Sequence, residues 1–240
     1  MKKRICLALL LLACAVLATA CAAKDETTTL ATSTSSVPTV INSSEYTLYQ
    51  NIFYNNYASQ YVGKSMTKRG VITSIYDAYS SVTRYYVCGY LDQTKCCDWQ
   101  WELQVEDPST LPAFGSLVEV TGTFAQNEGA LDQYWLSNAK VNTLTTYTGA
   151  TADINMLTMT GTLERVQVMN YSSNHEAFEG KTVFAYGRVY GPNMFQDPYY
   201  DGSWMAAFVT NDEVPAVGTS IILRGVMQAG IITDAKLETI

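Results

Sequence analysis

The chain has 240 residues, with 15 Lys and Arg, 22 Asp and Glu and a hydrophobic fraction of 48%. Three of the basic residues and none of the acidic ones lie in the first 21 positions, so the chain from residue 22 onward carries a net charge of −10. Such a surface repels phosphate backbones, which argues against nucleic acid as a partner.

The first predicted element is an export signal over residues 1–21. Lys2, Lys3 and Arg4 precede a short apolar run over residues 5–17, and small residues then lead to Cys21. This order is typical of a signal peptide, and the apolar run is too short for a stable spanning helix. The end of the segment, Leu-Ala-Thr-Ala-Cys over residues 17–21, resembles a bacterial lipoprotein lipobox, with alanine where leucine is commoner. The resemblance implies lipidation of Cys21 and anchoring to the extracytoplasmic face of the cell membrane.

Two other interpretations of this segment stay open. Residues 11–14, Leu-Leu-Ala-Cys, form a second lipobox candidate with a much shorter apolar core. The segment also fits an ordinary secretory signal in which the cysteine is coincidental.

Residues 22–44 are rich in Ser and Thr and show no apolar period, so they are predicted to form a disordered tether. A flexible segment of this length spans roughly 25 Å root-mean-square. Acyl chains at Cys21 would hold the protein to the lipid membrane without a transmembrane helix.

The remaining sequence contains one pattern twice. Three pairs of segments match in the same order: 61–72 (YVGKSMTKRGVI) with 178–189 (FEGKTVFAYGRV), 111–124 (LPAFGSLVEVTGTF) with 214–227 (VPAVGTSIILRGVM), and 138–141 (NAKV) with 234–237 (DAKL). Repeated order of this kind indicates two copies of one module. We therefore predict domains over residues 45–148 and 149–240.

Alternation within these segments predicts strands. Val118, Val120, Gly122 and Phe124 fall on one face of a strand, and Ile221, Leu223, Gly225 and Met227 repeat that face in the second copy. Glycines at 70, 122, 187 and 225 lie inside predicted strands, where they favour the bulges and bends that curl a short sheet into a barrel. A helix is predicted before the first set of strands, over residues 45–61 with Ser44 as its cap.

The Gly-Lys openings at Gly63 and Gly180, with the Pro-x-x-Gly strands that follow, resemble the OB-fold, a five-stranded Greek-key barrel. More narrowly, the chain is similar to uncharacterised lipoproteins of Gram-positive anaerobes with tandem domains of this kind. Those proteins have a Cys-Cys pair before a strand, as at Cys96 and Cys97, and a further cysteine in the last strand, where this chain has Trp135. The predicted fold class is all-β with short helices: two tandem small OB-like barrels after a signal peptide and a tether.

Three cysteines, Cys88, Cys96 and Cys97, lie in a part of the first copy that the second copy lacks. The first copy has fourteen more residues between Gly70 and Gly122 than the second has between Gly187 and Gly225. Residues 85–90, a polar turn over 92–95 and residues 97–105 read as a hairpin. In an oxidising exterior, Cys88 could pair with Cys96 or Cys97 and leave one free thiol. A soft-metal site for copper(I) or zinc, a redox site and thiols without a role are the alternatives.

Aromatic residues are the candidate ligand contacts. They are Trp99, Trp101, Tyr134 and Trp135 in the first copy, and Tyr199, Tyr200 and Trp204 in the second. OB-like barrels bind saccharides or nucleic acids on one sheet face, and with nucleic acid disfavoured by charge the candidate ligands are carbohydrate or protein. The alternative, which we favour, is that most of these rings fill the cores of two small barrels.

Enzyme motifs are missing from the sequence: there is no nucleophile elbow, phosphate-cradling loop or metalloprotease helix. We therefore predict a membrane-anchored extracytoplasmic lipoprotein that binds a ligand rather than catalyses a reaction, with no cofactor. The alternative is a thiol-based metal-handling or redox protein of the cell envelope that uses Cys88, Cys96 and Cys97.

Overall fold

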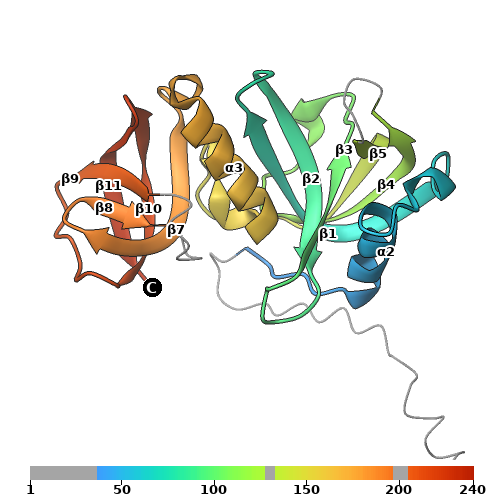
Figure 1. The fold of residues 1–240 in the computed structure, drawn as a ribbon, viewed down its shortest axis with the longest axis horizontal. Coiled ribbons are helices and arrows are strands. Elements are labelled where there is room, and N and C mark those ends of the chain that lie inside the picture. The colour runs from blue at the N-terminus through green and yellow to red at the C-terminus, as the bar shows by residue number, and fades with distance from the viewer. Residues whose placement is uncertain (1–36, 128–132, 197–204) are drawn as a thin grey trace, which may run out of the picture.

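A computed structural model describes residues 37–127, 133–196 and 205–240 (Figure 1). Two β-sheets lie side by side, and helix α3 (Gly161–Ser173) stands between them (Figure 1). Helix α2 (Ser43–Phe53) packs against the first sheet on the side away from α3. No helix in the described ranges is long and apolar enough to cross a membrane.

The first sheet closes into a five-stranded barrel with the strand order β1-β2-β3-β5-β4. Neighbouring strands are antiparallel, except for β3 and β5, which run parallel. The strands are β1 (Ser65–Asp77), β2 (Val82–Tyr90), β3 (Asp98–Leu103), β4 (Leu117–Gln126) and β5 (Tyr134–Thr145), with short 3-10 helices η1 (Ala58–Gln60) and η2 (Pro108–Thr110). The predicted hairpin is formed by β2 and β3.

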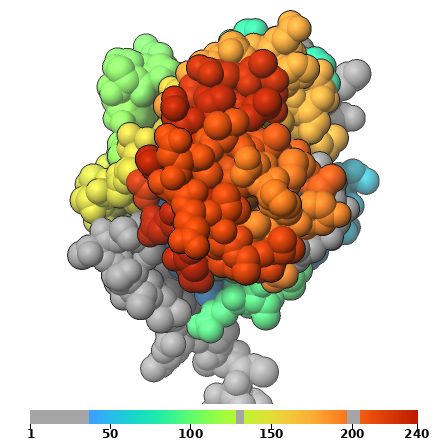
Figure 2. Space-filling view, turned by 90° about the vertical axis from the view of Figure 1, so that its left-hand side faces the viewer, coloured from blue at the N-terminus to red at the C-terminus, as the bar shows by residue number. Residues whose placement is uncertain are grey.

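The second sheet repeats this arrangement. Its order is β10-β11-β9-β8-β7-β6. An additional pairing joins β10 to β7, so the sheet curls round and its first strand meets its fifth. The parallel pair β9 and β11 corresponds to β3 and β5, and the short strand β6 adds a second parallel pairing, with β7. The elements are β6 (Ile154–Asn155), η3 (Met156–Thr158), η4 (His175–Phe178), β7 (Thr182–Gly191), β8 (Met194–Gln196), β9 (Met205–Thr210), β10 (Ser220–Gln228) and β11 (Ile231–Thr239). Figure 2 shows the end of the molecule that this sheet forms, coloured orange to red. The predicted all-β class with two barrel-like sheets in tandem is confirmed.

Glycine marks the irregular positions of both sheets. The pairing of β4 with β5 shifts register between Thr121 and Thr123, around Gly122, and that of β10 with β11 shifts between Arg224 and Val226, around Gly225. A Cβ atom on Gly225 would come within 2.4 Å of the Ile232 side chain. The close approach of the two strands therefore requires glycine at this bulge.

Helix α2 closes one end of the first barrel. Its Phe53 ring lies 5.7 Å from Trp101 and 6.4 Å from Phe124, measured between ring centroids. Lys68 is buried below the helix, with its Nζ 2.9 Å from Glu45 Oε2 and 4.7 Å from the Trp101 ring centre. Breaking such a buried pair leaves an uncompensated charge, so the pair fixes the position of α2 on the barrel.

The helix is shorter than predicted and starts from a different cap. Asn42, not Ser44, accepts a hydrogen bond from the Glu45 backbone N–H, and the helix ends at Phe53 rather than residue 61. Three residues after the helix, Asn56 has a φ of 58°. Asparagine tolerates this left-handed conformation, which a helix interior does not use.

Part of the predicted tether belongs to the folded body. Val40 is buried, Ile41 forms a parallel bridge with Tyr90, and backbone hydrogen bonds of 2.9 Å join Asn42 N to Tyr90 O and Tyr90 N to Val40 O. The backbone of the last residue of β2 thus binds a short extended segment that composition alone assigns to a disordered stretch. Residues 1–36, which include the predicted export signal, lie outside the described residues.

Helix α3 joins the two barrels. The buried Gln167 side chain accepts a hydrogen bond of 2.8 Å from the Tyr76 backbone N–H and donates one of 3.2 Å to the Tyr76 carbonyl. Asn170 donates a second bond to the same carbonyl, and on the other side the Tyr171 hydroxyl donates to the Gly230 carbonyl at 2.8 Å. One helix therefore bonds to strand β1 of the first barrel and to the β10–β11 turn of the second.

Candidate functional site

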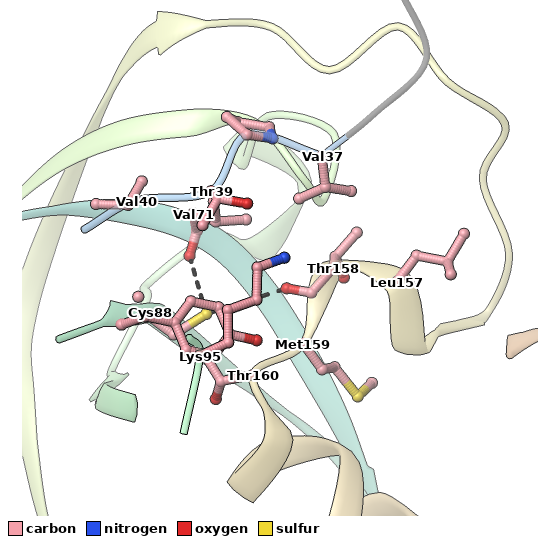
Figure 3. A pocket seen from close by; sticks show the side chains of 13 residues that line it. Val37, Thr39, Val40, Val71, Cys88, Lys95, Leu157, Thr158, Met159 and Thr160 are labelled. Carbon is pink, nitrogen blue, oxygen red and sulfur yellow. Dashed lines mark hydrogen bonds between the residues drawn. The ribbon is translucent and has the colours of Figure 1, made fainter. Parts of the chain in front are cut away.

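Cys88 is a core residue, not part of a cysteine cluster. Its side chain is 1% exposed, and its sulfur lies 3.5 Å from the Val71 carbonyl and 4.0 Å from the Thr158 carbonyl (Figure 3). Burial raises the pKa of this thiol far above its ordinary value. All three cysteines of the described residues are free thiols. The expected bridge from Cys88 to Cys96 or Cys97 is therefore not formed, because β2 directs Cys88 into the barrel.

A small cavity surrounds this thiol (Figure 3). It measures about 60 Å³ and lies where the entering chain at Val37, strand β2 and the linker at Thr158 meet. Ligand pockets commonly enclose roughly 300–1,000 Å³, so this cavity is too small for a ligand larger than a few atoms. We interpret it as a small packing void where the two halves of the chain meet.

Cys96 and Cys97 lie together at the end of the β2–β3 loop. Their sulfur atoms are 3.4 Å apart, although neighbouring side chains on a strand would point to opposite faces. The loop conformation is fixed by Asp92, which accepts hydrogen bonds from the Thr94 N–H and hydroxyl, and by the Leu91 N–H, which donates to the Cys97 carbonyl at 2.8 Å. This turn brings both thiols to one side.

The two thiols differ in their surroundings. Cys96 is exposed, whereas Cys97 is half-buried and forms a hydrogen bond with the Tyr46 hydroxyl of helix α2. The hydrogen bond with Cys96 raises the pKa of the Cys97 thiol, and the bond with Tyr46 opposes that shift. Cys96 is therefore the sulfur that a reagent meets first.

A groove of about 430 Å³ separates this loop from helix α3. Its described lining consists of Lys95, Cys96, Asp98, Gly161, Thr162, Arg165, Val166 and Met169. Lys95 and Arg165 supply positive charge, while Val166 and Met169 are 41% and 62% exposed and form an apolar strip on the helix. The groove combines cationic and apolar surface with one accessible thiol.

Asp98 holds the two walls of the groove together. Its carboxylate, at the start of β3, accepts hydrogen bonds of 2.7 Å from both the N–H and the hydroxyl of Thr162. Thr160, at the N-cap position of α3, makes no side-chain capping bond, so a residue of the first barrel performs this role. The carboxylate also suits the positive end of the helix dipole.

The predicted aromatic contacts are mostly core residues. Trp99 and Trp101 are fully buried, and Trp99 Nε1 donates to the Tyr90 carbonyl at 3.3 Å. Tyr134 is half-buried and stacks on Phe124 with centroids 5.1 Å apart, and Trp135 is half-buried on β5. The prediction that Trp99 and Trp101 contact a ligand is therefore wrong, because both rings are buried in the barrel core. Tyr199, Tyr200 and Trp204 lie outside the described residues.

In the described part of the chain, no group of three or more His, Cys, Asp or Glu side chains is placed to hold a metal ion. Only the Cys96–Cys97 pair of the predicted cysteine cluster is assembled. The groove itself was missed by sequence reasoning, since it forms between a loop of the first copy and a helix of the second. No protein-family model, curated protein or solved structure matches the chain.

The thiols are expected to differ sharply in reactivity. A thiol reagent applied to the folded protein at pH 8 should modify Cys96 at least about 100-fold faster than Cys88, because burial both blocks access and raises the Cys88 pKa, leaving almost no thiolate. Trypsin separates the two sites into peptides 85–95 and 96–140, so mass spectrometry follows each. Denaturant should remove the difference; equal labelling of both peptides in the folded protein would contradict the placement of Cys88.

Proposed function

We propose that this protein is exported, anchored by lipid at Cys21, and acts as a binding module whose site is the groove between the β2–β3 loop and helix α3. The basic, apolar and small-residue order of residues 1–21 supports the export and the anchor. The closed order of β1 to β5, with its single parallel pair, supports the resemblance to OB-like barrels.

The groove is the observation that carries the proposal. At about 430 Å³ it falls within the usual size of ligand sites, unlike the cavity beside Cys88. Its walls are held by Asp98 on one side and by the Gln167 bonds on the other, so it exists before a ligand arrives. Preorganisation of this kind lowers the entropic cost of binding.

The chemistry of the groove favours an acidic, partly apolar protein segment. Lys95 and Arg165 attract carboxylates, and the strip of Val166 and Met169 receives apolar side chains. A carbohydrate site would offer exposed aromatic faces, and the described lining contains no aromatic ring. The net charge of −10 after residue 21 argues against nucleic acid.

The anchor would place the groove close to the membrane. Val37 and Lys95 line the same small cavity, and Lys95 also lines the groove, so the chain enters the folded body beside the site. Fifteen residues lie between Cys21 and Val37, so the sixteen Cα-to-Cα steps from one to the other span at most about 55 Å even when fully extended. A ligand bound in the groove would therefore be held within that distance of the lipid surface.

Selection from a random-peptide display library on the purified protein tests the groove. We expect enrichment of peptides with acidic and apolar residues, and at least about tenfold weaker binding to Met169→Asp, a loss of about 1.4 kcal/mol, because the change puts negative charge on the apolar strip. Val217→Asp is the matched control, since Val217 is 68% exposed on the second barrel. Peptides that bind both variants equally, or no enrichment, would refute the groove as the site.

Replacement of Cys21 tests the anchor. In a bacterial host that lipidates exported proteins, the wild-type chain should partition into the detergent phase of a phase-separating detergent, because its acyl chains add apolar surface. Cys21→Ser should move to the aqueous phase, and Cys14→Ser should behave like wild type. Detergent partitioning of Cys21→Ser would contradict lipidation at this residue.

A further inference from the structure

The neighbouring thiols Cys96 and Cys97 suggest chemistry beyond binding. Their sulfur atoms lie 3.4 Å apart on one side of a loop whose conformation is fixed by Asp92 and by the Leu91–Cys97 backbone bond. The loop therefore presents a ready-made dithiol, and this arrangement does not depend on any rearrangement of the chain.

A disulfide between these two residues would be a labile one. Neighbouring Cα atoms are about 3.8 Å apart, whereas disulfide-linked Cα atoms usually lie roughly 4.4–6.8 Å apart. A bond forced into this short span is strained and easily reduced, and strained, exposed disulfides are the ones that exchange rather than stabilise. Cys88 offers no competing partner, because its buried sulfur faces the Val71 carbonyl.

The two sulfurs are placed for a two-step exchange. Cys96 lines the groove and is exposed, so an incoming disulfide reaches it first. Cys97 lies behind it, half-buried and hydrogen-bonded to Tyr46, within reach of the Cys96 sulfur. Lys95 and Arg165 surround the same groove with positive charge, which attracts carboxylates near the reacting sulfur.

We propose that Cys96 and Cys97 form a thiol–disulfide exchange site that acts on acidic peptide disulfides entering the groove beside α3. The proposal extends the proposed function from binding to a reaction, and it relies on the groove only for the position of the substrate. Oxidised glutathione, a small peptide disulfide with several carboxylates, is the simplest probe.

The reaction balances without another oxidant. The Cys96 sulfur attacks one sulfur of the substrate disulfide, a Cys96–substrate bond forms, and the first substrate thiol leaves with the proton from Cys96. The Cys97 sulfur then attacks the Cys96 sulfur, the mixed disulfide breaks, and the second substrate thiol leaves with the proton from Cys97. Two protein thiols are oxidised to one Cys96–Cys97 bond while one substrate disulfide is reduced to two thiols, and the reverse reaction reduces the pair.

The test is treatment of the reduced, folded protein with an excess of oxidised glutathione, followed by acid quenching, blocking of free thiols and mass analysis of peptides 85–95 and 96–140. In the wild-type protein we expect peptide 96–140 to lose two hydrogens and to retain little glutathione. Cys97→Ser, which lacks the second sulfur, should retain about tenfold more glutathione on Cys96. Cys88→Ser should match the wild type.

Three results would overturn the proposal: glutathione retained by the wild type as fully as by Cys97→Ser, thiols of peptide 96–140 that remain unreacted, or a bridge between peptides 85–95 and 96–140. Peptide binding, measured on the same wild-type protein, separates this proposal from the proposed function. Exchange that fails in the wild type while peptide binding persists would remove the chemistry and leave the binding module.

Discussion

The amide of Gln167 is the contact on which the arrangement of this molecule depends. It bonds to both the N–H and the carbonyl of Tyr76 on β1, much as a neighbouring strand would, and it does so from a helix that belongs to the second half of the chain. The Gln167 side chain is fully buried, and leaving its amide groups unpaired would cost about 1–3 kcal/mol each. With Asn170 on the same carbonyl and Tyr171 on Gly230, helix α3 is bonded to both barrels at once.

This joint creates the groove, and neither half of the chain contains the groove alone. The first copy supplies the loop with Lys95, Cys96 and Asp98, which lies in the segment that the second copy lacks, and the second copy supplies the face of α3. Asp98 caps that helix through Thr162 and so ties the loop to the wall opposite. The extra residues of the first copy therefore lie at the interface between the copies, where their loop faces helix α3 of the second copy.

The parts of the fold that depend on local pattern could be predicted from the sequence. Alternation around Val118 and Ile221, and glycines such as Gly122 and Gly225, indicated strands that bend, and the strands and bulges are found there. The parts that depend on tertiary contact could not be predicted in this way. Composition assigned residues 37–44 to a tether, because a Ser- and Thr-rich segment carries no sign that Tyr90 will pair with it. Trp99 and Trp101 serve equally well as core or as ligand platform until the barrel is closed around them.

The placement of the cysteines could not be predicted either, because it too depends on tertiary contacts. Spacing allowed Cys88 to pair with either later cysteine, and only the inward direction of β2 separates it from them. The side-by-side placement of Cys96 and Cys97 depends on a turn whose side-chain bonds are not visible as a periodic pattern. The groove depends on how two copies dock, for which a repeat in the sequence holds no direct signal.

Helix α3 fixes the two barrels in one relative orientation, and residual dipolar couplings of the backbone amides test this most directly. Couplings from β1 to β5 and from β7 to β11, measured in one weakly aligned sample, should fit a single alignment tensor, because the Gln167 and Asp98 bonds fix the relative orientation. Two different tensors would show that the barrels reorient independently, and the groove between them would then not be preformed.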